Sequence, residues 1–135
     1  QMIVTSSGNY GINSSNSALR ITRSTVTGGT LSGILFTNTD FELSSTVINS
    51  TGSGVEITNV SKGVINEVSG SNNLYGVNLT AGSVIKNGTN SITGILGDIN
   101  VGNRGPRTWL QVSTGSQTNC SDILMDPSQY VSISN

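Results

Sequence analysis

Few side chains in this sequence could perform chemistry, and the carboxylates are the first to consider. The chain has 135 residues, with seven acidic side chains and no histidine, so the usual general base and commonest metal ligand is missing. Asp40 and Glu42 flank Phe41, which on a strand would put both carboxylates on one face with Cα atoms ~6.6 Å apart. Glycosidases use carboxyl pairs about 5 to 9.5 Å apart. Asp40 and Glu42 are therefore the candidate catalytic residues.

Aromatic side chains are the second group with a possible role. Tyr10, Tyr75 and Trp109 are among six aromatic residues in the chain, and each could offer a platform for a sugar ring. For Trp109, packing in the core or at the end of the fold is the favoured role. Cys120 is the single cysteine, which excludes an intrachain disulfide and favours a packed, inert thiol. The sequence predicts no metal site and no cofactor.

The composition excludes several classes of partner. Six basic residues against seven acidic ones give a net charge of -1, so electrostatics do not favour nucleic acid or an anionic membrane. No run of ~18 apolar residues is present, and we expect no membrane insertion. Only 33% of the residues are hydrophobic, which predicts a thin core.

A repeat positions these side chains. The triplet of Tyr or Ser, then Gly, then a β-branched residue occurs four times, with its glycines at steps of 22, 21 and 22 residues. The triplets are Tyr10-Gly11-Ile12, Ser32-Gly33-Ile34, Ser53-Gly54-Val55 and Tyr75-Gly76-Val77. Apolar residues alternate with polar ones after each triplet, which is typical of a short strand with one buried face. A fixed period of this length predicts a solenoid.

Three further sets of residues follow the same period. Asparagine comes five residues after the first three glycines, a second apolar pair follows, and a valine marks a third strand. These are Asn16, Asn38 and Asn59, with Ala81 in the fourth coil; Leu19 with Ile21 and Phe41 with Leu43, less regularly Val64 and Val84; and Val4, Val26, Val47 and Val68. We expect the four valines to form one inward-facing column. Stacked asparagines can pass amide hydrogen bonds from coil to coil and adopt a left-handed turn conformation.

Three strands per ~22 residues predict an all-β fold, a parallel β-helix whose coils stack ~4.8 Å apart. Residues 1–101 would form the coils and residues 102–135 an end cap with C-terminal strands. The ~22-residue period places Glu42 beside Arg20 in adjacent coils, because each lies nine residues after the glycine of its triplet. An exposed ion pair is therefore favoured over catalysis at Glu42.

The triplet pattern resembles the right-handed β-helices of the pectin-lyase-like superfamily. The stretch at residues 97–109, Gly-Asp-Ile-Asn-Val-Gly-Asn-Arg-Gly-Pro-Arg-Thr-Trp, is similar to the end of the β-helix in bacteriophage tailspikes and tail appendages. That resemblance implies a homotrimer on the virion tail or an extracellular surface. It also implies binding to a bacterial surface polysaccharide.

Two other functions stay open at this point. The chain could contribute one wall of a polysaccharide lyase or glycoside hydrolase site that missing coils or neighbouring subunits complete. It could also be a fragment of a bacterial adhesin or autotransporter passenger, which should be monomeric. The first valine already occupies the third-strand position, so we expect further coils of a parent chain before Gln1. From the residues alone, no enzymatic activity is expected of this chain by itself.

Overall fold

The computed structural model describes residues 1–87, 90–101, 109–112 and 130–133. These residues contain twelve strands and no helix, so none of their segments is a helix that could cross a membrane. The strands are β1 (Ile3–Ser6), β2 (Tyr10–Ser15), β3 (Ala18–Thr22), β4 (Thr25–Gly28), β5 (Ser32–Thr37), β6 (Asp40–Ser44), β7 (Val47–Asn49), β8 (Ser53–Asn66), β9 (Ser69–Asn87), β10 (Ser91–Val101), β11 (Trp109–Val112) and β12 (Tyr130–Ile133).

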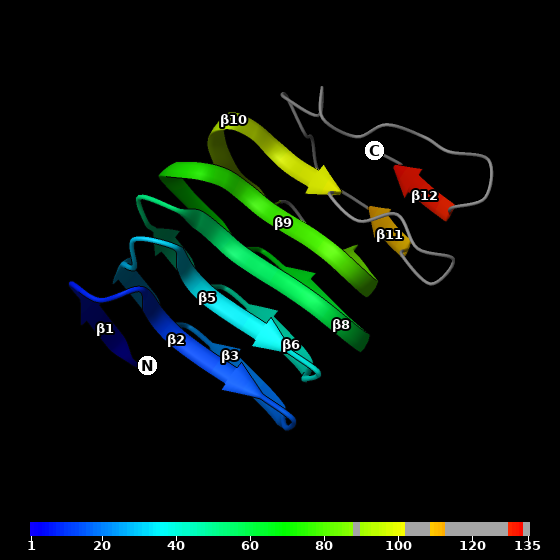
Figure 1. Cartoon of the computed structure of the whole chain (residues 1–135), viewed down its shortest axis with the longest axis horizontal. Helices are drawn as coiled ribbons and strands as arrows, with labels where there is room; N and C mark the ends of the chain where they lie inside the picture. The colour runs from blue at the N-terminus through cyan, green and yellow to red at the C-terminus, as the bar shows by residue number, and fades with distance from the viewer. Residues whose placement is uncertain (88–89, 102–108, 113–129, 134–135) are drawn as a thin grey trace.

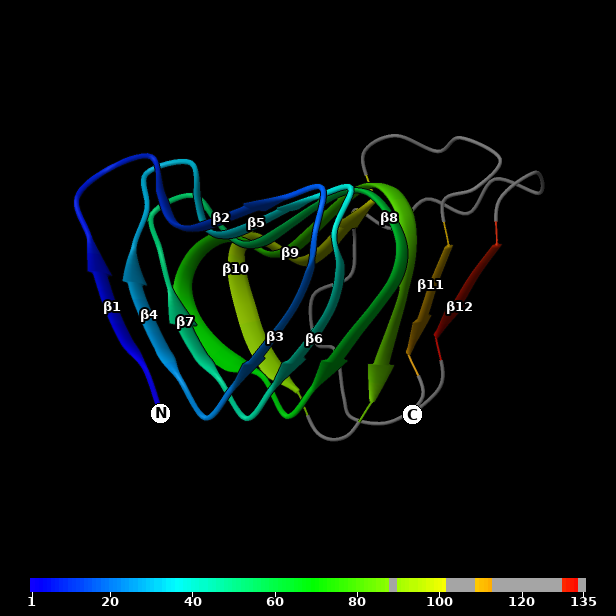
Figure 2. The ribbon, with the colours of Figure 1, turned by 90° about the horizontal axis from the view of Figure 1, so that it is seen from below.

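The strands form three parallel ladders that share one interior, as the repeat predicts. The first ladder holds β2, β5 and parts of β8, β9 and β10. The second holds β3, β6, the ends of β8 and β9, then β11 and β12. The third holds β1, β4, β7 and the starts of β9 and β10. Figures 1 and 2 show these ladders wound as successive coils, and the fold is a parallel β-solenoid.

The first ladder confirms the predicted column of β-branched residues. Ile12 pairs with Ile34, which pairs with Val55, and Val55 pairs with Val77. The glycines before the first three are required by a close backbone approach: a Cβ on Gly11 would lie 2.6 Å from the carbonyl oxygen of the next coil's glycine. Such a contact is impossible without moving the strands apart, so the triplet keeps its glycine for space.

The prediction of a single valine column in the third ladder was wrong. Val4 does pair with Val26, but the next residue in that column is Ile48, which is fully buried. Val47 is 38% exposed and points away from the interior. Val68 is buried but lies in a neighbouring column, because Ser69, the residue after it, pairs with Val47.

The error has a physical cause in where the period changes. The third ladder keeps steps of 22 residues, from Val26 to Ile48 and from Gly70 to Ile92. The step of 21 belongs to the first ladder, where Ser32 pairs with Ser53. Successive side chains in a strand point to opposite faces. Assigning the step of 21 residues to the third ladder therefore selects Val47, which points outward, in place of Ile48, which points inward.

The two largest aromatic core side chains meet across the first corner of the coil, Phe36 from β5 in the first ladder and Phe41 from β6 in the second. The rings of Phe36 and Phe41 stack with centroids 4.0 Å apart, and Gly63 in the next coil leaves room for them, since a Cβ there would lie 2.6 Å from the Phe41 ring. The expectation that Val64 belongs to the inward set was wrong. Val64 pairs with Glu42 on the outer face, and Ile65 is the buried residue.

The period continues beyond the fourth triplet. Ile99 pairs with Val77, so a fifth coil enters the first ladder with the usual spacing. Thr93-Gly94-Ile95, which looks in sequence like a shortened coil, instead lies in the first half of β10, and Gly94 pairs with Asn73. Strand β11 pairs in parallel with residues 83–86 of β9. Most of the predicted end cap, residues 102–135, lies outside the described residues.

Candidate functional site

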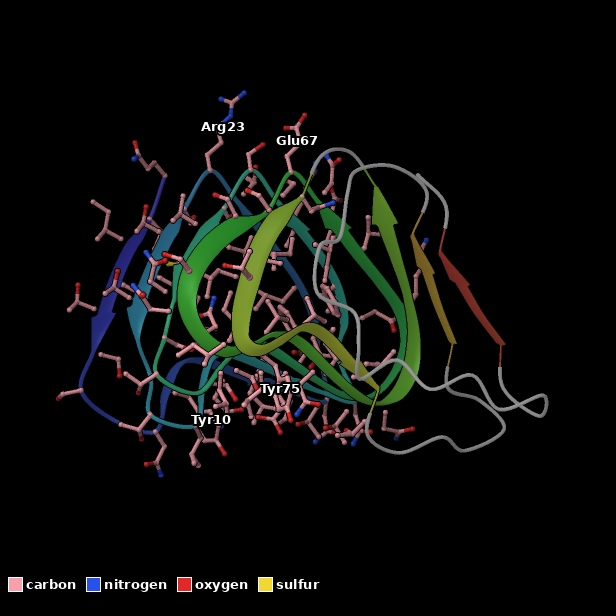
Figure 3. The ribbon with its side chains drawn as sticks, turned by 90° about the horizontal axis from the view of Figure 1, so that it is seen from above. Tyr10, Arg23, Glu67 and Tyr75 are labelled. Carbon is pink, nitrogen blue, oxygen red and sulfur yellow. The ribbon has the colours of Figure 1, made fainter. Side chains whose placement is uncertain are left out.

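Two of the predicted sugar-binding residues, Tyr10 and Tyr75, line a single groove on the outer face of the first ladder. Tyr10 opens β2, and pairing across β5 and β8 places Ser32 and Ser53 between the two tyrosines. Three steps between coils separate Tyr10 from Tyr75, about 14 Å along the solenoid axis. Figure 3 shows both on the side opposite the corner that carries Arg23. We call this surface the tyrosine groove.

The floor of the tyrosine groove is polar. Ser32 is fully buried and Ser53 is 6% exposed, because both are small residues in a column whose ends are tyrosines. The Ser32 hydroxyl donates a hydrogen bond to Oε2 of Glu56. Glu56 is half-buried and lines the groove together with Asn78, its neighbour in the next coil. Hydroxyl, amide and carboxylate groups therefore lie between two aromatic rings.

The side of the groove opposite Glu56 is apolar. Leu31 and Leu74 both line it and are 52% and 38% exposed. Each directly precedes a triplet, Leu31 before Ser32 and Leu74 before Tyr75, where the chain passes from the third ladder to the first. The groove encloses about 340 Å³, and its mixture of apolar walls with a few polar groups is typical of ligand sites.

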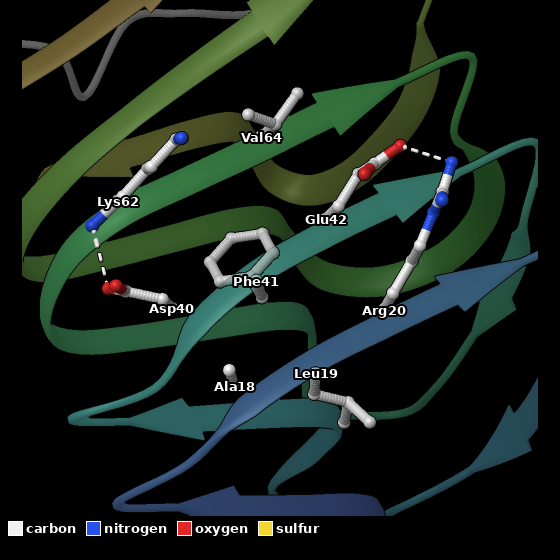
Figure 4. A pocket seen from close by; sticks show the side chains of 8 residues that line it. All are labelled: Ala18, Leu19, Arg20, Asp40, Phe41, Glu42, Lys62 and Val64. Carbon is white, nitrogen blue, oxygen red and sulfur yellow. Dashed lines mark hydrogen bonds and ion pairs between the residues drawn. The ribbon is translucent and has the colours of Figure 1, made fainter.

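The carboxylate pair lies elsewhere, in a shallow depression on the outer face of the second ladder (Figure 4). Asp40 and Glu42 come from β6, as the alternation predicts, and Phe41 between them points inward. Arg20 and Lys62 line the depression from the coils on either side. Figure 4 places the four charged side chains around the Phe41 ring.

Each carboxylate in this depression already has a partner. Arg20 Nη2 lies 3.1 Å from Glu42 Oε1, which confirms the predicted ion pair. Asp40 Oδ1 accepts a hydrogen bond of 3.0 Å from the Lys62 backbone N–H. The side chains of the ion pair are 69% and 44% exposed, so solvent screens them. A catalytic role for Asp40 and Glu42 stays a prediction.

The other candidates contribute less to a site. The Trp109 side chain lies outside the described part of the structure, although its backbone begins β11, and Cys120 also lies outside it. Within the described part, no three His, Cys, Asp or Glu side chains gather where a metal could bind.

Sequence reasoning missed Glu56, Leu31 and Leu74 as groove residues. A signal for Glu56 existed, because it follows Val55 directly and so must point outward from the first ladder. The first residue of the triplet is Tyr, Ser, Ser and then Tyr along the chain. The two small serines leave the space between the two tyrosine rings. Leu31 lies in the bend before β5 and Leu74 in β9, and the residue that precedes each triplet has no repeated type that indicates its direction.

Comparison with known proteins adds no assignment: the chain matches no protein-family model, no curated protein and no solved structure.

Proposed function

We propose that this chain is a glycan-binding part of a bacteriophage tailspike or tail appendage with a right-handed, pectin-lyase-like β-helix. The observation that supports binding is the tyrosine groove, where Tyr10 and Tyr75 enclose a polar floor. Aromatic faces pack against the C–H faces of sugar rings, and the serine, amide and carboxylate groups can hydrogen-bond to sugar hydroxyls. A groove that crosses several coils suits a linear bacterial surface polysaccharide.

In this proposal the chain acts as a homotrimer on the virion tail or another extracellular surface. Lateral association would stabilise a rod whose core is thin, since only 33% of the residues are hydrophobic. Light scattering on the purified chain tests this part. A trimer is expected, and a monomer at micromolar concentration would favour an adhesin or autotransporter passenger instead.

The binding proposal is tested by replacing the two tyrosines. We expect Tyr75→Ala to weaken binding to an immobilised polysaccharide at least about tenfold, because an aromatic platform contributes more than a kilocalorie to such contacts. Arg23→Ala is the matched control, since Arg23 is exposed on the opposite corner (Figure 3). Unchanged binding by a Tyr10→Ala, Tyr75→Ala double variant would reject the groove as the site.

A second function is favoured by the charged depression. Asp40 and Glu42 share one face with Arg20 and Lys62, so a polysaccharide lyase or glycoside hydrolase site completed by other coils or subunits could use them. Reducing-end and unsaturated-sugar assays on capsule and O-antigen panels test this, with Asp40→Asn and Glu42→Gln. Loss of turnover in either variant supports the enzyme. Turnover at the wild-type rate in both variants excludes Asp40 and Glu42 as catalytic residues.

A further inference from the structure

We infer that the tyrosine groove selects neutral or amino-bearing glycans and rejects glycans that carry carboxylate or phosphate groups. This inference rests on the proposed glycan binding and adds the chemical class of the ligand. It starts from the charge of the groove. Among the described residues that line it, Glu56 is the only one with a formal charge.

The structure holds the Glu56 carboxylate in place. The hydroxyl of Ser32, which is fully buried, donates a hydrogen bond to Oε2 of Glu56. The strand pairing fixes Glu56 between Leu35 and Asn78. A carboxylate anchored by a buried hydroxyl cannot swing away from a ligand as a free surface side chain can. The negative charge is therefore a fixed part of the groove wall.

The depression around Phe41 provides the contrast. Its two carboxylates lie among Arg20 and Lys62, so a ligand there would meet both signs of charge. The residues of the tyrosine groove that the structure describes include no lysine or arginine. An anionic sugar placed between the tyrosines would meet an uncompensated like charge, which weakens its binding.

Neutral sugars meet the opposite situation. A sugar hydroxyl donates to a carboxylate oxygen in a charge-assisted hydrogen bond, and an amino sugar adds an ammonium group that pairs with the same charge. The class of ligand thus follows from one anchored side chain.

The test uses the full chain and a panel of immobilised polysaccharides in neutral, amino-bearing, uronic-acid and phosphate-bearing forms. The wild type is expected to bind members of the first two groups. Glu56→Gln, whose side-chain oxygen can still accept the hydrogen bond from the Ser32 hydroxyl, is expected to raise binding of the acidic members at least about tenfold. Glu67→Gln is the matched control, because Glu67 also accepts a serine hydroxyl and lies on the opposite corner (Figure 3).

The outcomes separate the two proposals. Wild-type binding to acidic polysaccharides that Tyr10→Ala and Tyr75→Ala abolish would leave the glycan-binding function intact and overturn the charge selection. An equal gain in the Glu56→Gln and Glu67→Gln variants would also overturn it, since net charge alone would then explain the effect. Absence of any tyrosine-dependent binding across the panel would overturn the proposed function itself.

Discussion

Two corners of the coil have the same backbone conformation but very different side chains. The first corner lies between the first and second ladders, and the second corner lies between the second and third. At both, one residue in each of the first three coils adopts a left-handed conformation with φ between 47° and 54°. The residues are Asn16, Asn38 and Asn59 at the first corner, and Arg23, Ser45 and Glu67 at the second.

The backbone has the same role at both corners. Asn16 donates its N–H to the Thr37 carbonyl in the next coil, and Arg23 donates to the Ser44 carbonyl. The left-handed residue thus turns the chain and continues the hydrogen bonds between coils. Because the two corners share this geometry, the conformation is imposed by the coil and does not depend on asparagine.

The side chains differ in what they add. Asn38 donates to Oδ1 of Asn16 at 3.1 Å and accepts a hydrogen bond from Asn59, so the first corner has a continuous amide ladder. At the second corner, only Ser45 and Glu67 are joined, by a hydrogen bond of 3.0 Å. Asparagine also tolerates the left-handed region better than other L residues. The first corner should therefore stabilise the coil more than the second.

The largest test of this difference replaces the middle residue of each corner with valine. A β-branched side chain is strained at positive φ, and Asn38→Val also removes two ladder hydrogen bonds. We expect Asn38→Val to lower the free energy of unfolding by about 3 kcal/mol and Ser45→Val by about 2 kcal/mol. Chemical denaturation measures both, and equal losses would contradict a separate contribution from the ladder.

Glycine isolates the ladder from the backbone strain. Asn38→Gly keeps the left-handed conformation but removes the amide, so we expect a loss of about 1.5 kcal/mol from two exposed hydrogen bonds. Ser45→Gly should lie within about 0.5 kcal/mol of the wild type, since relief of strain offsets its single lost hydrogen bond. A loss at Ser45 as large as that at Asn38 would show that the two corners are equivalent.

The contrast between the corners also explains what the sequence could predict. Asn16, Asn38 and Asn59 repeat one residue type with one period, so their stacking and left-handed conformation were predicted and are confirmed. Arg23, Ser45 and Glu67 share the conformation but no chemical type, and no pattern identified them. A repeat is visible in sequence only where side chains, and not just backbone angles, are the same.

The candidate site shows the same limit. Tyr10 and Tyr75 were identified by type, and the period placed both at the start of a first strand. Their groove depends on what lies between and beside them, which includes an irregular turn before Ser53 where the coil loses one residue. A period of 22 with one unassigned deletion gives the fold but not the direction of every side chain, as the misplaced Val47 showed.

A gain of stability is expected from making the second corner more like the first. Ser45→Asn should raise the free energy of unfolding by about 1 kcal/mol, because asparagine tolerates positive φ and its amide can still bond to Glu67. Ser15→Asn is the matched control, an exposed strand position without positive φ, where no gain is expected. Thermal unfolding compares the two, and equal shifts would mean that the corner conformation costs little.

The smallest effect is expected for a charge pair on a strand, where no unusual φ is involved. Arg20 and Glu42 are 69% and 44% exposed, and such pairs contribute about 0.5 kcal/mol or less after solvent screening. A double-mutant cycle with Arg20→Ala and Glu42→Gln measures the coupling, which should vanish in high salt. A coupling above about 1.5 kcal/mol would show that surface side-chain contacts alone can stabilise the coil. The difference between the two corners would then need no contribution from backbone conformation, because the amide ladder could account for it.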